Sequence, residues 1–125
     1  MDDVYELFRR GSELLEAGDH HQAALPLARA RDLAPEQTSI REALGRALFH
    51  NRQYEQAAQE FQAVIDRAPT NDFALFCLGR SLQLLGRHAE ARQPLALAAC
   101  LQPSRLDYRE YRDRARARAA EISGG

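Results

Sequence analysis

Small and apolar residues recur along this chain at a fixed spacing of 34 residues, through three successive copies. A period of this length is typical of stacked two-helix hairpins, because each hairpin buries its apolar face against the next one. Proline cannot continue a helix, so a proline at the same position of every copy marks the end of each hairpin. The matched positions are Pro35, Pro69 and Pro103; Gly11, Gly45 and Gly79; Leu14, Leu48 and Leu82; Ala23, Ala57 and Ala91; Leu27, Phe61 and Leu95; and Ala30, Val64 and Ala98.

The spacing of these positions predicts an all-α chain with seven helices. Glycine and alanine inside the helices indicate that neighbouring helices approach closely, since a larger side chain would force them apart. The predicted helices span residues 3–17, 20–33, 37–50, 54–67, 71–84, 88–101 and 105–122.

The turns and two further prolines carry specific expectations. Gly18 and Gly86 occupy the turns inside the first and third hairpins, and Arg52 occupies the turn inside the second. Left-handed backbone angles cost a residue other than glycine about 1 kcal/mol. Pro26 and Pro94 fall inside second helices. We expect both rings on the outer face, where water can bond the carbonyl group that each proline leaves unpaired.

At these positions the chain resembles the tetratricopeptide repeat family, whose pattern of aromatic, Leu-Gly, aromatic, Ala, Phe and Pro residues has the same period. The resemblance implies a right-handed superhelical stack of three helix-turn-helix hairpins followed by a C-terminal solvating helix, in one domain. The family's tryptophan position holds Leu7, Arg41 and Leu75, and Arg10 replaces the leucine before the first glycine. The implied parts are repeats 4–37, 38–71 and 72–105, a capping helix over 105–122 and a disordered tail over 123–125, within a single domain over 1–125.

Both ends of the predicted stack carry polar surfaces. Where later repeats place Ile40, Ala47, Ala74 and Ser81 toward the preceding repeat, the first repeat has Glu6 and Glu13. At the other end, one stripe of the last helix is apolar and is expected to dock on the third repeat. We therefore expect a monomer, because polar terminal faces prevent repeat arrays from polymerising. The stripe comprises Tyr108, Tyr111, Ala115, Ala119 and Ile122.

Composition narrows the setting of the protein. The 17 basic residues are all arginine, which we interpret as a mark of a GC-rich, bacterial genome rather than of function. The formal net charge is −1, so no overall field attracts nucleic acid or membranes. The chain has no apolar run of about 20 residues and no signal peptide, and we expect a cytoplasmic protein. Cys77 and Cys100 are interpreted as reduced thiols.

Nothing in the sequence indicates catalysis, and we expect neither enzymatic activity nor a cofactor or metal. The four histidines lack the paired helical spacing of metal ligands, and no phosphate loop or nucleophile elbow occurs.

The resemblance implies a concave groove lined by the first helix of each repeat. Five of the nine aromatic residues fall on that arc, which is typical of an anchor site for a partner. Arg46, Arg80 and Arg114 share one repeat position, and their guanidinium groups suit carboxylates of a bound segment. The predicted groove residues are Tyr5, Phe8, Arg9, Ser12, Glu42, Ala43, Arg46, Phe49, Phe73, Phe76, Cys77, Arg80, Glu110 and Arg114.

The leading interpretation is an adaptor that binds a peptide segment or helix of a partner protein bearing apolar anchors and acidic residues. The alternative is a ribosome- or RNA-associated protein that uses the arginine ladder and the basic last helix. Similar domains clamp the C-terminal carboxylate of chaperone tails with charged and amide side chains, but the matching positions here argue against that ligand. These positions are Phe8, Ser12, Ala43, Phe73 and Cys77.

Overall fold

The seven helices begin and end within two residues of the predicted bounds in a computed structural model, which describes residues 3–124. Asp3 caps the first helix, its Oδ1 accepting from the Glu6 backbone N–H at 2.8 Å, and Asn71 caps the fifth in the same way. The helices are α1 (Val4–Glu16), α2 (His20–Leu33), α3 (Thr38–His50), α4 (Tyr54–Arg67), α5 (Asp72–Leu84), α6 (His88–Leu101) and α7 (Leu106–Gly124).

Each hairpin turns through one residue with left-handed backbone angles. The φ values are 85° at Gly18, 79° at Gly86 and 63° at Arg52. In every turn the residue that follows donates its backbone N–H to a carbonyl five residues earlier, as Gln53 does to Leu48 at 2.9 Å. The prediction for these turns is confirmed: Arg52 adopts the left-handed conformation that Gly18 and Gly86 adopt without strain.

The helical glycines allow the two helices of a hairpin to touch. A Cβ atom at Gly79 would lie 2.4 Å from Leu95 Cγ, and one at Gly45 would lie 2.8 Å from Phe61 Cζ. Such separations are shorter than real Cβ contacts, so a side chain at either position would force Leu95 or Phe61 to shift.

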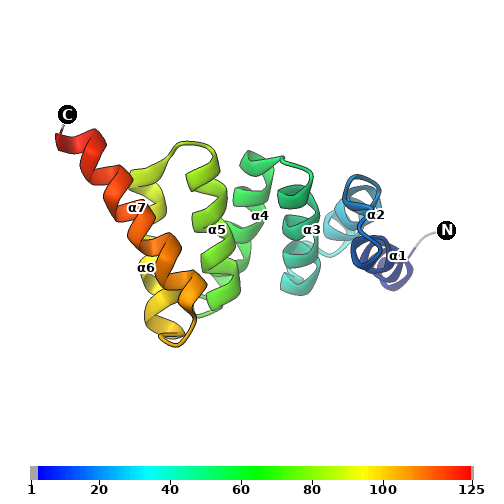
Figure 1. Cartoon of the computed structure of the whole chain (residues 1–125). Helices are drawn as coiled ribbons and strands as arrows, with labels where there is room; N and C mark the ends of the chain where they lie inside the picture. Colours follow the sequence, from blue (N-terminus) through cyan, green and yellow to red (C-terminus); the bar gives the residue numbers. More distant parts are fainter. Residues whose placement is uncertain (1–2, 125) are drawn as a thin grey trace.

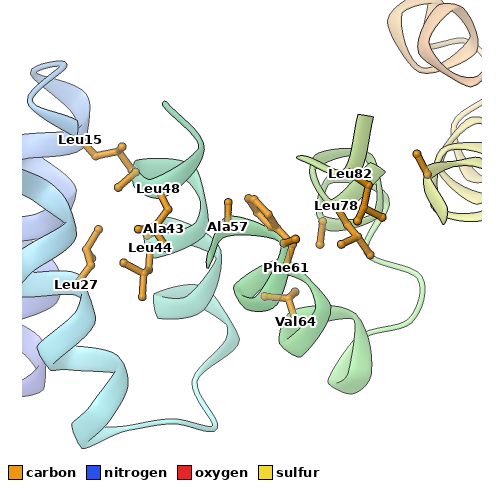
Figure 2. Close-up of a cluster of buried hydrophobic side chains, with 14 of the residues drawn as sticks. Leu15, Leu27, Ala43, Leu44, Leu48, Ala57, Phe61, Val64, Leu78 and Leu82 are labelled. Carbon is orange, nitrogen blue, oxygen red and sulfur yellow. The ribbon is translucent and has the colours of Figure 1, made fainter. Parts of the chain in front are cut away.

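The hairpins stack in sequence order into an elongated array with the two termini at opposite ends (Figure 1). Figure 2 shows the continuous core. Leu27 of α2 faces Leu44 of α3, and Phe61 of α4 lies next to Leu78 of α5. The chain is therefore all-α across its described residues, as predicted, and its first helices lie on a common side.

The expected outward position of the two helical prolines is wrong. Pro26 and Pro94 are buried. Pro94 lies at a cavity wall with Ala58 of α4 and Leu78 of α5, so neighbouring helices cover its ring, and α2 and α6 continue through both prolines.

Repeat two replaces this arrangement with a buried ion network. Glu60 stands at the repeat position of the two prolines, and Arg41 stands at the position of the buried Leu7 and Leu75. Glu60 is 7% exposed and accepts from Arg31 at 2.6 Å and Arg41 at 3.0 Å, while Arg41 Nε also donates to the Pro35 carbonyl at 2.7 Å. An apolar pair of positions in repeats one and three has thus become a charged pair in repeat two.

The N-terminal face of the stack is polar, as predicted. Glu6 and Glu13 hold Arg9 between them at 2.8 and 3.0 Å on exposed α1. Their counterparts in later repeats are buried against the preceding hairpin: Ile40, Ala47, Ala74 and Ser81.

The C-terminal helix docks through most of its predicted stripe. Tyr108, Ala115 and Ala119 are at most 2% exposed, and the Tyr108 hydroxyl donates to Asp72 Oδ2 at 2.8 Å. Ile122 is 66% exposed, because α7 runs back along α6 and extends past the first turn of α6 (Figure 1), so its place in the stripe is wrong. No proline interrupts α7, which continues to Gly124; two residues of the predicted disordered tail are therefore helical, and residue 125 lies outside the described part.

Candidate binding groove

Side chains from the first helices and α7 form a row of three adjoining cavities, which we call the groove. The cavity between α3, α5 and α7, here the aromatic cavity, has a volume of about 470 Å³. Five aromatic rings form most of its wall, so it can hold an apolar side chain of a partner. Its lining residues are Arg46, Phe49, His50, Phe61, Phe73, Phe76, Cys77, Arg80, Asp107 and Tyr111.

The phenylalanines of this cavity also pack against the core. Phe73 meets the buried Phe61 edge to face at 6.4 Å between ring centroids, and Phe76 stacks on Tyr108 at 4.6 Å. These rings therefore belong to the core as well as to the predicted groove, because the groove arc of α5 also abuts α4 and α7. Truncating either ring would cost stability as well as any ligand contact.

Two arginines stand in the aromatic cavity without a carboxylate partner. Within residues 3–124, neither Arg46 nor Arg80 forms an ion pair. Arg80 lies over the Tyr111 ring, its Cζ 3.9 Å from the ring centroid, and donates to Gln83 Oε1 at 3.0 Å. Glu42, four residues before Arg46, instead accepts from Asn71 Nδ2 at 3.3 Å. The cavity therefore offers positive charge beside an apolar wall.

The remaining titratable side chains of the cavity do not suit covalent chemistry. Burial, reinforced by the charge of Glu42, raises the pKa of the Cys77 thiol to about 12. Cys77 is therefore protonated at neutral pH and serves as a small apolar wall residue. Burial, followed by repulsion from His20 and Arg46, lowers the pKa of His50, whose ring stacks on His20 at 4.5 Å.

The other two cavities continue the groove toward the N-terminus. The one between α1 and α3 has a volume of about 200 Å³, and Glu16 and Glu42 are its only acidic lining residues. Neither of these carboxylates has an ion-pair partner among the residues that the structure describes. The last cavity, about 460 Å³, lies against α1 alone. The α1–α3 cavity also includes Phe8, Ser12, Leu15, Ser39, Ala43 and Arg46, and the α1 cavity is lined by Tyr5, Phe8, Arg9, Ser12, Glu13 and Glu16.

The structure distributes the predicted groove residues over these cavities, except for two. Glu110 and Arg114 line none of the three; they pair with each other at 2.6 Å on the exposed side of α7. Tyr111 was assigned to the docking stripe, yet it lines the aromatic cavity. Its repeat position is that of Ala43 and Cys77, two predicted groove residues, and this register could have identified it.

Arg105, which directly precedes α7, and several arginines within α7 are paired with acidic side chains of that helix. Arg105 bonds Asp107 at 2.8 Å, Arg112 bonds Asp113 at 3.0 Å, and Arg118 bonds Glu121 at 3.3 Å. Such local pairs reduce the field that a nucleic acid would meet at this end.

Across residues 3–124, no three or more His, Cys, Asp or Glu side chains gather in a way that would hold a metal ion. None of the described helices combines the length and apolarity needed to cross a membrane.

Comparison with known proteins places this geometry in a family. A sequence model of the tetratricopeptide repeat matches residues 8–72, more than half of the chain, and a second with the same description matches residues 60–93. The chain belongs to the tetratricopeptide repeat family. Mouse (Mus musculus) Superkiller complex protein 3 is 32% identical to it over 83 residues, which is 66% of this tetratricopeptide repeat chain and 5% of the mouse protein.

Solved structures share the fold of this tetratricopeptide repeat domain. A MamA double mutant superposes with a TM-score of 0.89 at 22% identity, covering 94% of this chain and 66% of the MamA chain. The first TPR of Spaghetti (RPAP3), bound to the HSP90 peptide SRMEEVD, gives 0.86 at 14% identity and covers 94% of both chains. YrrB, described as a TPR protein with an unusual peptide-binding site, gives 0.83 at 21% identity over 90% of this chain and 58% of YrrB.

Proposed function

We propose that this protein is a non-catalytic adaptor that binds a peptide segment or helix of a partner protein in its groove. The observation that carries the proposal is the aromatic cavity, in which Arg46 and Arg80 lie without ion-pair partners beside five aromatic rings. An apolar side chain of the partner would anchor in this cavity, and an acidic neighbour would bond the guanidinium groups.

Relatives of the same fold support a protein ligand. The RPAP3 domain holds a peptide of HSP90, and YrrB is described by its peptide-binding site. The five positions that match the carboxylate clamp of chaperone-binding domains, Phe8 and Cys77 among them, lack its charged and amide side chains. The proposed ligand of this chain is accordingly a different segment, bound by a cytoplasmic monomer.

The test is partner affinity across matched arginine substitutions. A partner captured from the source cell is titrated against wild type, Arg80→Ala and Arg118→Ala. Arg80 lines the aromatic cavity, whereas Arg118 lies on exposed α7 and is the control. Arg80→Ala should weaken binding by about tenfold or more, and Arg118→Ala should leave it unchanged. Equal affinity of wild type and Arg80→Ala would contradict the proposal.

Salt dependence separates this function from RNA binding. Binding through an apolar anchor and one or two carboxylates should weaken only modestly between low and physiological salt, whereas neutralising several phosphates makes affinity fall steeply. A steep salt dependence combined with sensitivity to Arg118→Ala would favour the RNA-associated alternative.

A further inference from the structure

The groove changes the sign of its charge along its length. At one end the aromatic cavity holds Arg46 and Arg80, which form no ion pair, while its one carboxylate, that of Asp107, is bonded by Arg105 at 2.8 Å. At the other, the α1–α3 cavity holds the unpaired Glu16 and Glu42. Arg46 lines both cavities, so they are adjacent parts of one binding surface.

The arrangement leaves these charges available to a ligand. Glu42 and Arg46 stand four residues apart on α3, a spacing that would allow them to pair on a helix surface, yet no ion pair joins them. Glu42 is oriented instead by Asn71, whose own side chain caps α5 by accepting from the Ala74 backbone N–H. The carboxylate is thus held apart from the guanidinium group by the start of the next repeat.

We propose that the segment bound in this groove is bipolar. Its carboxylate and a neighbouring apolar anchor enter the aromatic cavity next to Arg46 and Arg80. Its basic side chain lies between Glu16 and Glu42 in the α1–α3 cavity. The inference rests on the proposed function and adds the order of charges to it. A segment with its charges reversed would place like charges together at both cavities, which disfavours binding.

The helix spacing sets the separation of the two charges. Arg46 lines both cavities, so their separation is one helix spacing, roughly 8–10 Å. An extended chain advances about 3.3 Å per residue, so the basic residue follows or precedes the anchor by about three residues.

The test begins with a displayed library of random peptides long enough to span both cavities. Peptides selected on the wild-type chain are resynthesised with a fluorophore, and each is paired with a version whose acidic and basic residues are exchanged. The two versions have the same composition and net charge. Fluorescence anisotropy should show that the exchange weakens binding by about tenfold or more.

A substitution assigns the basic residue to its cavity. Glu42→Gln keeps an oxygen for Asn71 but removes the charge, so it should abolish most of the benefit of the basic residue. Glu16→Gln repeats the test at an exposed side chain of α1, which, unlike Glu42, accepts no hydrogen bond from another helix or loop within residues 3–124. Glu36→Gln, exposed between α2 and α3, removes the same charge outside the groove and should change nothing.

The outcomes distinguish the inference from the function on which it rests. Selected peptides that bind wild type and Arg80→Ala equally, or a library that yields no binder, would contradict the proposed function itself. Peptides that require Arg80 but bind equally well after the exchange, or that keep their charge preference in Glu42→Gln and Glu16→Gln, would overturn the bipolar groove alone.

Discussion

The ion network of repeat two tests most sharply how the hairpins are held together. Glu60 of α4 accepts from Arg41 of α3 and from Arg31 of α2, and its side chain is 7% exposed. Because the equivalent positions of repeats one and three are apolar, the network can be replaced by side chains of the kind that the fold already accommodates. The perturbation is Glu60→Leu and Arg41→Leu, singly and together.

The contacts set the expected magnitudes. Glu60→Leu removes two charge-assisted hydrogen bonds, each worth about 1.5–3 kcal/mol when buried. Water recovers part of this loss because the Arg31 and Arg41 side chains are 28% and 21% exposed, and Arg31 keeps Asp32 at 3.0 Å. We expect a net loss of about 3 kcal/mol, and about 1–2 kcal/mol for Arg41→Leu, which leaves Glu60 paired with Arg31.

The double variant should be nearly as stable as wild type, within about 1 kcal/mol, because two apolar side chains replace a charged pair as a unit. The two single losses sum to about 4–5 kcal/mol, so the cycle gives a favourable coupling of about 3–5 kcal/mol between the two positions. Chemical and thermal unfolding followed by circular dichroism measure it, and Glu60→Leu alone should lower the melting temperature by roughly 10 °C.

Arg87→Leu is the matched control. Arg87 also bonds two carboxylates, Glu55 and Glu90, but all three side chains are at least 40% exposed, so the unfolding midpoint should hardly move. A double variant as unstable as the sum of its two single variants would refute the reasoning, because the two side chains would then act independently.

Three further predictions concern single positions. Gly79→Ala should destabilise the chain by about 1–2 kcal/mol in urea unfolding, because the alanine Cβ would lie 2.4 Å from Leu95 Cγ. The better helix propensity of alanine offsets only part of this loss, and an unchanged midpoint would show that the helices can separate. Arg52→Gly should raise stability by up to about 1 kcal/mol, since φ is 63° there, and a lower melting temperature would show that the arginine has another role. Towards a thiol reagent at neutral pH, exposed Cys100 should react quickly and Cys77 slowly, because burial raises the pKa of the Cys77 thiol to about 12; equal rates at neutral pH would show that the aromatic cavity opens in solution.

The fold could be predicted because each repeat carries its own backbone and packing requirements in local residues. A glycine that touches the partner helix, a left-handed turn residue and a proline after the second helix act over a few residues each, and the fixed period repeats them. Gly45 and Gly18 are examples, and the structure places both as the pattern predicted.

The groove could be predicted only in part, because one helix arc serves two purposes. Phe73 and Phe76 lie on the arc away from their own hairpin core, but the helices that flank α5 cover part of each ring. The pairing of Arg41 with Glu60 was equally hidden. It joins residues 19 apart on neighbouring helices, and neither charge alone indicates its partner.

The most direct measurement of the central claim, that a partner protein binds in the groove, is site-specific photocrosslinking in the source cell. A photoreactive benzoylphenylalanine replaces His50, which is exposed and lines the aromatic cavity, or Gln62, which lines the cavity between α4, α5 and α6 on the other side of the stack. The account predicts a discrete crosslinked protein band with His50→benzoylphenylalanine and none with Gln62→benzoylphenylalanine. A band from position 62 without one from position 50 would contradict it.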